Sequence, residues 1–127
     1  MPVQEAMEQA NPQVLSVVML ESPEALRNVR EIAAVPGIDV LMIGCNDLSM
    51  ELGIAGQLNH AAMVAARRNV VEACRLHGKT PGLGGIADAD LLRRCIRDEG
   101  MRFVLASNDT DLLLDAGPAR VGSLQRA

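Results

Sequence analysis

Two acidic residues stand where they could hold a divalent cation together. Glu21 directly follows the apolar run of residues 14–20, and Asp47 closely follows a second apolar run at residues 38–43. Two carboxylates without a basic neighbour repel each other unless they share a cation or a proton. Either acid alone is more often structural, as a helix cap or a first-turn charge. Their matching places after two strands favour an oxygen-only site for Mg²⁺ or Mn²⁺.

The elements that must position these acids alternate regularly along the chain. Short apolar runs rich in Val, Ile and Leu indicate buried strands, and amphipathic segments with capping residues indicate helices between them. We expect strands at residues 14–20, 38–43, 80–86 and 101–106. We expect helices at residues 22–35, 61–77 and 89–99, a short helix and loop at residues 48–56, and a last helix after Asn108 and Asp109 that is broken at Gly117-Pro118.

This β-α-β-α order predicts an α/β fold with a parallel sheet. Active sites of such folds lie at the carboxyl ends of the strands, where Glu21, Asn46-Asp47 and Ser107-Asn108-Asp109 all occur. Four units in 127 residues amount to about half of the ~250 residues of a complete barrel. One possible form is a (β/α)4 half of a TIM-type barrel, with residues 1–127 as a single domain. A small doubly wound sheet is the alternative, although no GxGxxG follows the first strand.

Composition excludes several classes of partner. The chain is 49% apolar, 22% charged and carries a net charge of −4. Phe103 is its one aromatic residue, so the stacking platforms of single-strand binders are missing, and the negative charge opposes phosphate-backbone binding. We therefore expect no nucleic-acid partner.

Cysteine usage and hydropathy indicate a cytoplasmic protein. Cys45, Cys74 and Cys95 are odd in number and widely spaced, which favours reduced thiols over disulfides or a zinc site. The first eleven residues carry no apolar stretch, so no signal peptide is visible. No apolar run reaches the roughly 18 to 20 residues of a membrane span.

Two blocks give the sequence a specific resemblance. The segment VVMLESPEALRNVREIAAVPGIDVLMIGCNDLSMELG contains ESPEAL and GCNDLS, and GKTPGLGGIADADLLRRCIRDEGMRFVLASNDTDLL continues it toward the C-terminus. From about residue 14 to residue 114 the chain resembles the HpcH/HpaI family of metal-dependent aldolases. The resemblance implies the phosphoenolpyruvate/pyruvate-binding type of barrel, with residues 14–20 as its fifth strand and 38–43 as its sixth.

The resemblance also implies chemistry. Glu21 and Asp47 match the family's two metal-ligand acids, for Mg²⁺ or Mn²⁺, with Co²⁺ possible. The turn formed by Gly44, Cys45, Asn46 and Asp47 matches the one whose backbone N–H groups receive the carboxylate of a pyruvate-like 2-oxo acid. A metal that chelates the keto and carboxylate oxygens stabilises the enolate formed on retro-aldol cleavage. The implied activity is a class II pyruvate-type aldolase, a carbon–carbon lyase acting on 2-keto-3-deoxy or 4-hydroxy-2-oxo acids.

The chain departs from the family pattern at Cys45 and in lacking the residues that the first half of the barrel supplies. Cys45 replaces the common Pro and is expected to be a small apolar filler. The family's general base, a His, and its enolate-stabilising Arg belong to the first half of the barrel, and neither His60 nor His77 is expected to replace that base. The pairs Arg67-Arg68 and Arg93-Arg94 lie on expected outer helices, so we expect them to be solvated.

Two functional hypotheses follow. In the first, the chain is the C-terminal half of an aldolase, inactive alone and completed by an N-terminal half-barrel chain. In the second, it is a catalytically inactive half-barrel that serves as a metal-binding or structural oligomeric unit. The first and last strands would leave two apolar edges open, so we expect a homo-oligomer or a complementary chain rather than a monomer.

Overall fold

Four short strands form the centre of the molecule. In the computed structural model, which describes residues 1–125, they pair in parallel in the order β1-β2-β3-β4, so β1 and β4 are the two edges, as expected. Apolar strands joined by right-handed helical crossovers account for this order. The strands are β1 (Val17–Leu20), β2 (Val40–Gly44), β3 (Thr80–Gly84) and β4 (Phe103–Val104).

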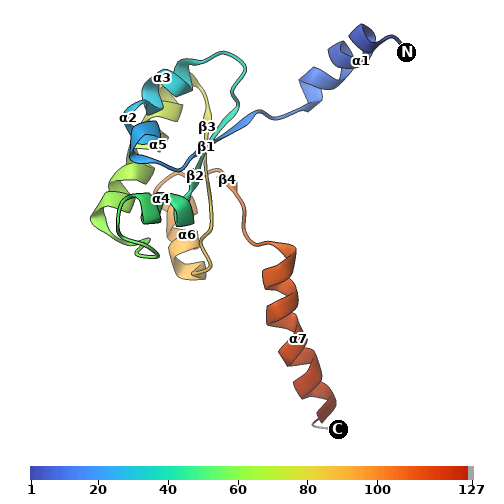
Figure 1. Cartoon of the computed structure of the whole chain (residues 1–127), viewed down its shortest axis with the longest axis vertical. Coiled ribbons are helices and arrows are strands. Elements are labelled where there is room, and N and C mark those ends of the chain that lie inside the picture. The colour runs from blue at the N-terminus through green and yellow to red at the C-terminus, as the bar shows by residue number, and fades with distance from the viewer. Residues whose placement is uncertain (126–127) are drawn as a thin grey trace.

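Five helices gather on one side of this sheet, and two stand away from it (Figure 1). The covering helices are α2 (Pro23–Arg27), α3 (Val29–Ala34), α4 (Cys45–Glu51), α5 (Ala61–His77) and α6 (Ala89–Arg97). The terminal helices are α1 (Val3–Ala10), followed by the 3-10 turn η1 (Asn11–Gln13), and α7 (Asp109–Gln125). Neither α1 nor α7 buries a residue.

The hydrophobic core lies between the sheet and the covering helices. Side chains alternate across a strand, and Leu20, Leu41, Ile43 and Leu83 point toward the helices, where each is at most 1% exposed. They pack against apolar residues of α3, α5 and α6 and against Met101: Val29, Ala33, Met63, Ala66, Val70, Leu91 and Cys95. One face of the sheet is thus fully covered.

The opposite face of the sheet has no helix over it among the described residues (Figure 1). Met19, Met42 and Gly82 stand in register across β1, β2 and β3, with Phe103 beside them on β4. Met19 is 44% exposed there. A Cβ at position 82 would lie 3.2 Å from the Phe103 Cβ, so the glycine allows the Phe103 side chain to pack closely against β3.

The strands are shorter than expected at the sheet edges. β1 begins at Val17, and Val14 and Leu15 are exposed instead of paired. β4 contains only Phe103 and Val104, which pair with Gly82 and Leu83 of its single neighbour β3. The predicted parallel pairing was right, and the predicted lengths were wrong by up to four residues.

Two helix predictions were also wrong. The expected helix at residues 22–35 is divided into α2 and α3 at Asn28, which caps the end of one and the start of the other. The expected break at Gly117-Pro118 does not occur, and α7 continues to Gln125 with Pro118 inside it. The carbonyl of Leu114, which would bond the missing proline N–H, belongs to an exposed residue, so water can bind it. No helix among residues 1–125 is long and apolar enough to cross a bilayer.

Candidate active site at the carboxyl ends of the strands

Glu21 lies one residue beyond β1 and packs directly against the end of β2. Leu20 is in register with Ile43, which places Glu21 level with Gly44. A Cβ built on Gly44 would stand only 2.6 Å from the Glu21 Oε1 and 2.7 Å from its Cγ. The missing side chain of Gly44 is therefore what makes room for the half-buried glutamate. Glu21 follows β1 and Asp47 follows β2, and these two strands are neighbours in the sheet, as predicted.

The segment after Gly44 is a helix, not the turn that we predicted. β2 runs through Gly44, and α4 begins at Cys45 without an intervening loop. Gly44 keeps an extended conformation as the N-cap, and Asp47 falls in the first helical turn, where the helix dipole favours a negative charge. Cys45 is buried, whereas Asn46 and Asp47 are exposed on the rim. The first-turn N–H groups of a helix have no acceptor within the helix.

The end of β3 approaches the same rim through Gly85. This glycine has a φ of +81°, and a Cβ there would lie 2.9 Å from the Asn46 Nδ2. Glu21, the Gly44–Asp47 segment and Gly85 therefore share one end of the sheet. Asn108, which follows β4, has a structural role: its Oδ1 accepts the N–H of Asp111 at 2.8 Å, in the first turn of α7.

The donor set of this rim fits a hard divalent cation held in part by other ligands. Among residues 1–125, no group of three or more His, Cys, Asp or Glu side chains is arranged to hold a metal. Mg²⁺ is commonly bound by only one or two carboxylates, with water and substrate oxygens completing the shell. The cradle that Gly44 provides for the Glu21 carboxylate, with Asp47 three residues further on, has this composition.

Cys45 is buried as predicted and has no sign of nucleophilic activation. Its thiol donates to the Ile43 carbonyl at 3.9 Å from inside the core. Burial raises the pKa of the Cys45 thiol to about 11, although the charge of Arg67 works in the opposite direction. All three cysteines are free and buried.

The two histidines lie at the two ends of α5. His60 is the exposed N-cap of this helix, and its Nδ1 accepts the N–H of Ala62 at 3.2 Å. His77 is exposed in the last turn. Both have the structural positions that we expected.

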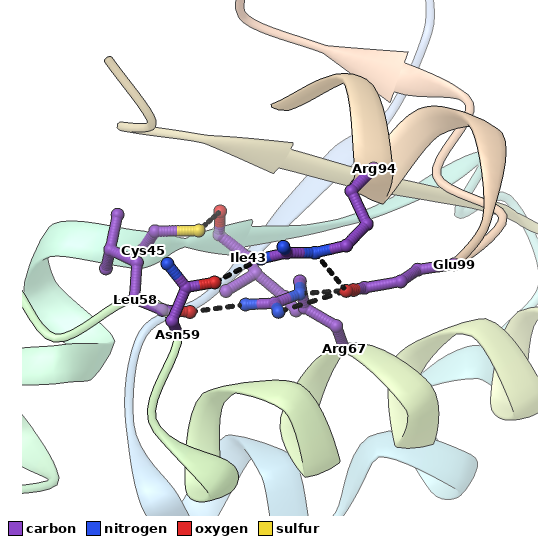
Figure 2. Close-up of polar contacts among 7 residues, drawn as sticks. All are labelled: Ile43, Cys45, Leu58, Asn59, Arg67, Arg94 and Glu99. Carbon is purple, nitrogen blue, oxygen red and sulfur yellow. Dashed lines mark hydrogen bonds and ion pairs between the residues drawn. The ribbon is translucent and has the colours of Figure 1, made fainter. Parts of the chain in front are cut away.

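One prediction about the arginines was wrong. Arg68, Arg93 and Arg94 are exposed as expected, but Arg67 is 0% exposed. Its Nε and Nη2 donate to the two carboxylate oxygens of Glu99, and its Nη1 donates to the Leu58 carbonyl at 2.8 Å (Figure 2). Burial lowers the pKa of Arg67, but the hydrogen bond to Glu99 together with the nearby negative charge outweighs this effect and raises the pKa, while the same hydrogen bond lowers the pKa of Glu99.

The burial of Arg67 could have been read from periodicity. Met63, Ala66, Val70 and Cys74 form the inner stripe of α5 at helical spacing, and position 67 falls on that stripe.

Comparison with known proteins identifies relatives over most of the chain. Residues 2–116 match the family model described as HpcH/HpaI aldolase/citrate lyase. A 4-hydroxy-4-methyl-2-oxoglutarate aldolase from Chaetomium globosum is 41% identical over 98 residues, which are 76% of this chain and 36% of that protein. A 4-hydroxy-2-oxo-heptane-1,7-dioate aldolase from Escherichia coli is 36% identical over 113 residues, 89% of this chain and 42% of that protein.

The structural comparison agrees. The crystal structure of an HpcH/HpaI aldolase from Desulfitobacterium hafniense superposes with a TM-score of 0.82 and 25% identity, covering 100% of this chain and 49% of that one. The chain thus spans less than half the length of these relatives and corresponds to about half of the solved fold.

Proposed function

The chain belongs to the HpcH/HpaI aldolase/citrate lyase family, and on this basis we propose that it is the metal-carrying half of a divalent-metal-dependent aldolase. The observation that supports this most is the packing of the Glu21 carboxylate on Gly44, beside the helical turn that contains Asp47. Residues 1–127 would form one C-terminal half-barrel domain. The proposed reaction is carbon–carbon cleavage of a 2-keto-3-deoxy or 4-hydroxy-2-oxo acid, in line with the names of the relatives.

The proposed roles are divided between two groups of residues. Glu21 and Asp47 would hold Mg²⁺ or Mn²⁺, and Co²⁺ is a third candidate. The backbone of Gly44, Cys45, Asn46 and Asp47 would receive the substrate carboxylate, since free N–H groups at the start of a helix suit an anion. When bound, the metal supplies a Lewis acid for the keto oxygen of the pyruvate unit. Gly44 leaves the space in which the Glu21 carboxylate is oriented.

A second half would complete the site. Parallel sheets are normally covered on both faces, and here the second face has no helix over it among the described residues (Figure 1) and exposes Met19 and Leu105 at its edges. We propose that an N-terminal half-barrel, in the same polypeptide or in another, covers it and brings the general base. A homo-oligomer that pairs the open edges is the alternative partner.

The first test is a Mn²⁺ titration followed by water-proton relaxation. We expect the parent chain to bind one Mn²⁺, and Glu21→Gln and Asp47→Asn each to weaken the affinity by about tenfold or more, roughly 1.4 kcal/mol. Glu51→Gln is the matched control, because Glu51 is exposed in the last turn of the same helix. Equal affinity in all four proteins would refute the assignment of the metal ligands.

The second candidate function, a catalytically inactive unit, is favoured by the places of His60 and His77 at the two ends of α5. Neither is in the rim, and a general base typically contributes 10² to 10⁴-fold. We therefore expect the purified chain to bind metal but to cleave 4-hydroxy-2-oxo acids at no more than a trace rate. Turnover at the rate of a complete relative would show that a base is present and would exclude this candidate.

A further inference from the structure

A buried polar bridge centred on Arg67 joins two segments that are far apart in sequence. The guanidinium of Arg67, on α5, donates through Nη1 to the Leu58 carbonyl at 2.8 Å. It also donates through Nε and Nη2 to the carboxylate of Glu99. Leu58 belongs to the loop between α4 and α5, and Glu99 follows α6. The Glu99 side chain is 20% exposed, so the carboxylate closes the bridge at the surface.

A second arginine reinforces the same connection from α6. Arg94 donates through Nη2 to the side chain of Asn59, and its Nε lies 3.9 Å from the Glu99 Oε1. Two guanidinium groups therefore join residues 58 and 59 to one carboxylate (Figure 2). No buried side-chain nitrogen or oxygen of the described residues is left without a hydrogen-bond partner.

The loop that the bridge anchors is itself tied to the first turn of α4. Ser49 is 0% exposed, and its Oγ accepts the Gly56 N–H at 3.1 Å and donates to the Asn46 carbonyl at 2.8 Å. The Ile54 N–H donates to the Ser49 carbonyl at 2.9 Å. An ordered path thus runs from Glu99 through Arg67 and residues 54–58 to Asn46, which is next to Asp47.

We propose that Arg67 and Ser49 are positioning residues that hold the first turn of α4 against the end of β2. This inference rests on the proposed function, because that turn contributes Asp47 to the metal site. α4 has only seven residues, and helices this short have little stability of their own. Its placement therefore depends on tertiary contacts: the core packing of Cys45 and Leu48, and the contacts of its C-terminal end and of the following loop.

The chemistry of the bridge suits positioning better than stabilisation. A guanidinium presents five donors in a fixed fork, so one side chain can bind a carboxylate and a carbonyl on opposite sides. An apolar residue could fill the same volume but could not bind the Leu58 carbonyl. Replacement of a whole buried ion pair by apolar residues is often neutral or stabilising. Mutation can thus separate the effect of the bridge on the position of the loop from its effect on the stability of the fold.

The test uses the full chain and three variants. Arg67→Met combined with Glu99→Leu removes the bridge without stranding a charge, and Ser49→Ala removes the tie to Asn46 and Gly56. Val70→Ala is the control, because Val70 is fully buried on the same helix and takes no part in the bridge. Backbone hydrogen exchange at Ile54 and Gly56 reports the loop, and Mn²⁺ titration reports the site.

We expect the bridge and Ser49 variants to exchange at Gly56 at least tenfold faster and to bind Mn²⁺ roughly tenfold more weakly, as losses of supporting contacts typically do. Val70→Ala should lower the unfolding midpoint but leave both quantities unchanged at temperatures well below it. Parent-like exchange and Mn²⁺ affinity in the bridge variant would overturn the inference, as would an equal response in Val70→Ala.

The two proposals fail separately in this experiment. If the parent binds no Mn²⁺, the proposed metal site is wrong, and the exchange at Ile54 and Gly56 still decides whether Arg67 and Ser49 hold the turn. If the parent and the bridge variant bind Mn²⁺ equally, with equal exchange, the metal site stands and the positioning role is wrong.

Discussion

The two faces of the sheet differ sharply in how completely they are covered. Toward the helices, Leu41 and Leu83 are 0% exposed. On the other face, Met19 and Leu105 at the edges are 44% and 50% exposed, whereas Val40 and Met42 at the centre are only 2% and 5% exposed. The same four strands therefore carry one finished core and one apolar surface without a layer. Since burial of apolar surface contributes roughly 25 cal/mol per Å², a second layer over the open face would add substantially to stability.

The contrast also separates the part of the proposed site that this chain provides from the part that a second half-barrel would provide. The helix-covered side contains the buried bridge and fixes the rim on which Glu21 and Asp47 stand. The relatives are about twice as long as this chain, and the open side is where we propose that a second half packs. The following predictions test this contrast, beginning with the largest expected effect.

The largest effect should come from a single change that strands a buried charge on the covered side. Glu99→Leu leaves the fully buried guanidinium of Arg67 without its carboxylate, and loss of one partner of a buried pair costs about 3 to 5 kcal/mol. The free energy of unfolding in urea measures this. Asp98→Asn is the control, because the neighbouring acid is exposed, and it should change stability by less than about 0.5 kcal/mol.

The next largest effect compares the two faces directly. Leu41→Ala empties a buried site and should cost about 2 to 5 kcal/mol. Met19→Ala, on the next strand but on the open face, should cost less than about 1 kcal/mol in the isolated chain. Chemical denaturation of both variants provides the comparison. A similar loss for both would mean that the open face is covered in solution.

Much of this architecture could be predicted from the sequence, for a physical reason. Parallel strands are buried by their crossovers, so they appear as apolar runs separated by capped helices. Ser22 caps α2 through the Ala25 N–H, and Asp88 caps α6 through the N–H groups of Asp90 and Leu91. Strand ends were less predictable, because the length of an edge strand such as β4 depends on how far its one neighbour pairs with it. That is a property of the tertiary structure, not of residues 101–106.

The candidate site was partly predictable for a similar reason. The strand period placed Glu21 and Asp47 after adjacent strands, but local pattern did not distinguish a turn from a helix that begins at Cys45. The contact between Glu21 and Gly44 joins residues 23 positions apart and depends on strand register. The roles of Arg67 and Glu99, 32 positions apart, likewise appear only after folding.

A smaller effect is expected from pH, again on the covered side. The hydrogen bond from Arg67 lowers the pKa of Glu99 below its value in the unfolded chain, about 4.3. The ion pair therefore contributes its stability fully above that value and loses it as the pH falls through the lower folded pKa. Urea unfolding between neutral and acid pH should show this loss. In Glu99→Gln this part of the pH dependence should disappear, and an unchanged pH profile would contradict it.

The smallest effect on stability should come from a charge on the open face, where the change instead affects assembly. Met19→Lys leaves the side chain partly in water, so the free energy of unfolding should change by only about 0.5 kcal/mol. A charge on an edge strand opposes edge-to-edge pairing. By light scattering at micromolar concentration, we expect the parent to be at least a dimer and Met19→Lys to be smaller. A cooperatively folding parent monomer would contradict the pairing.

The most direct test of the central claim is a chimera that joins this chain to the N-terminal half-barrel of a complete relative. Residues 14–125 would replace the corresponding C-terminal segment of the Escherichia coli 4-hydroxy-2-oxo-heptane-1,7-dioate aldolase. Cleavage of that substrate would then be measured with Mn²⁺ in the folded chimera. We predict metal-dependent cleavage that falls by about 10² or more in the Glu21→Gln and Asp47→Asn chimeras, but not in Glu51→Gln. A folded chimera that cleaves equally well without these two carboxylates, or not at all, would contradict the account.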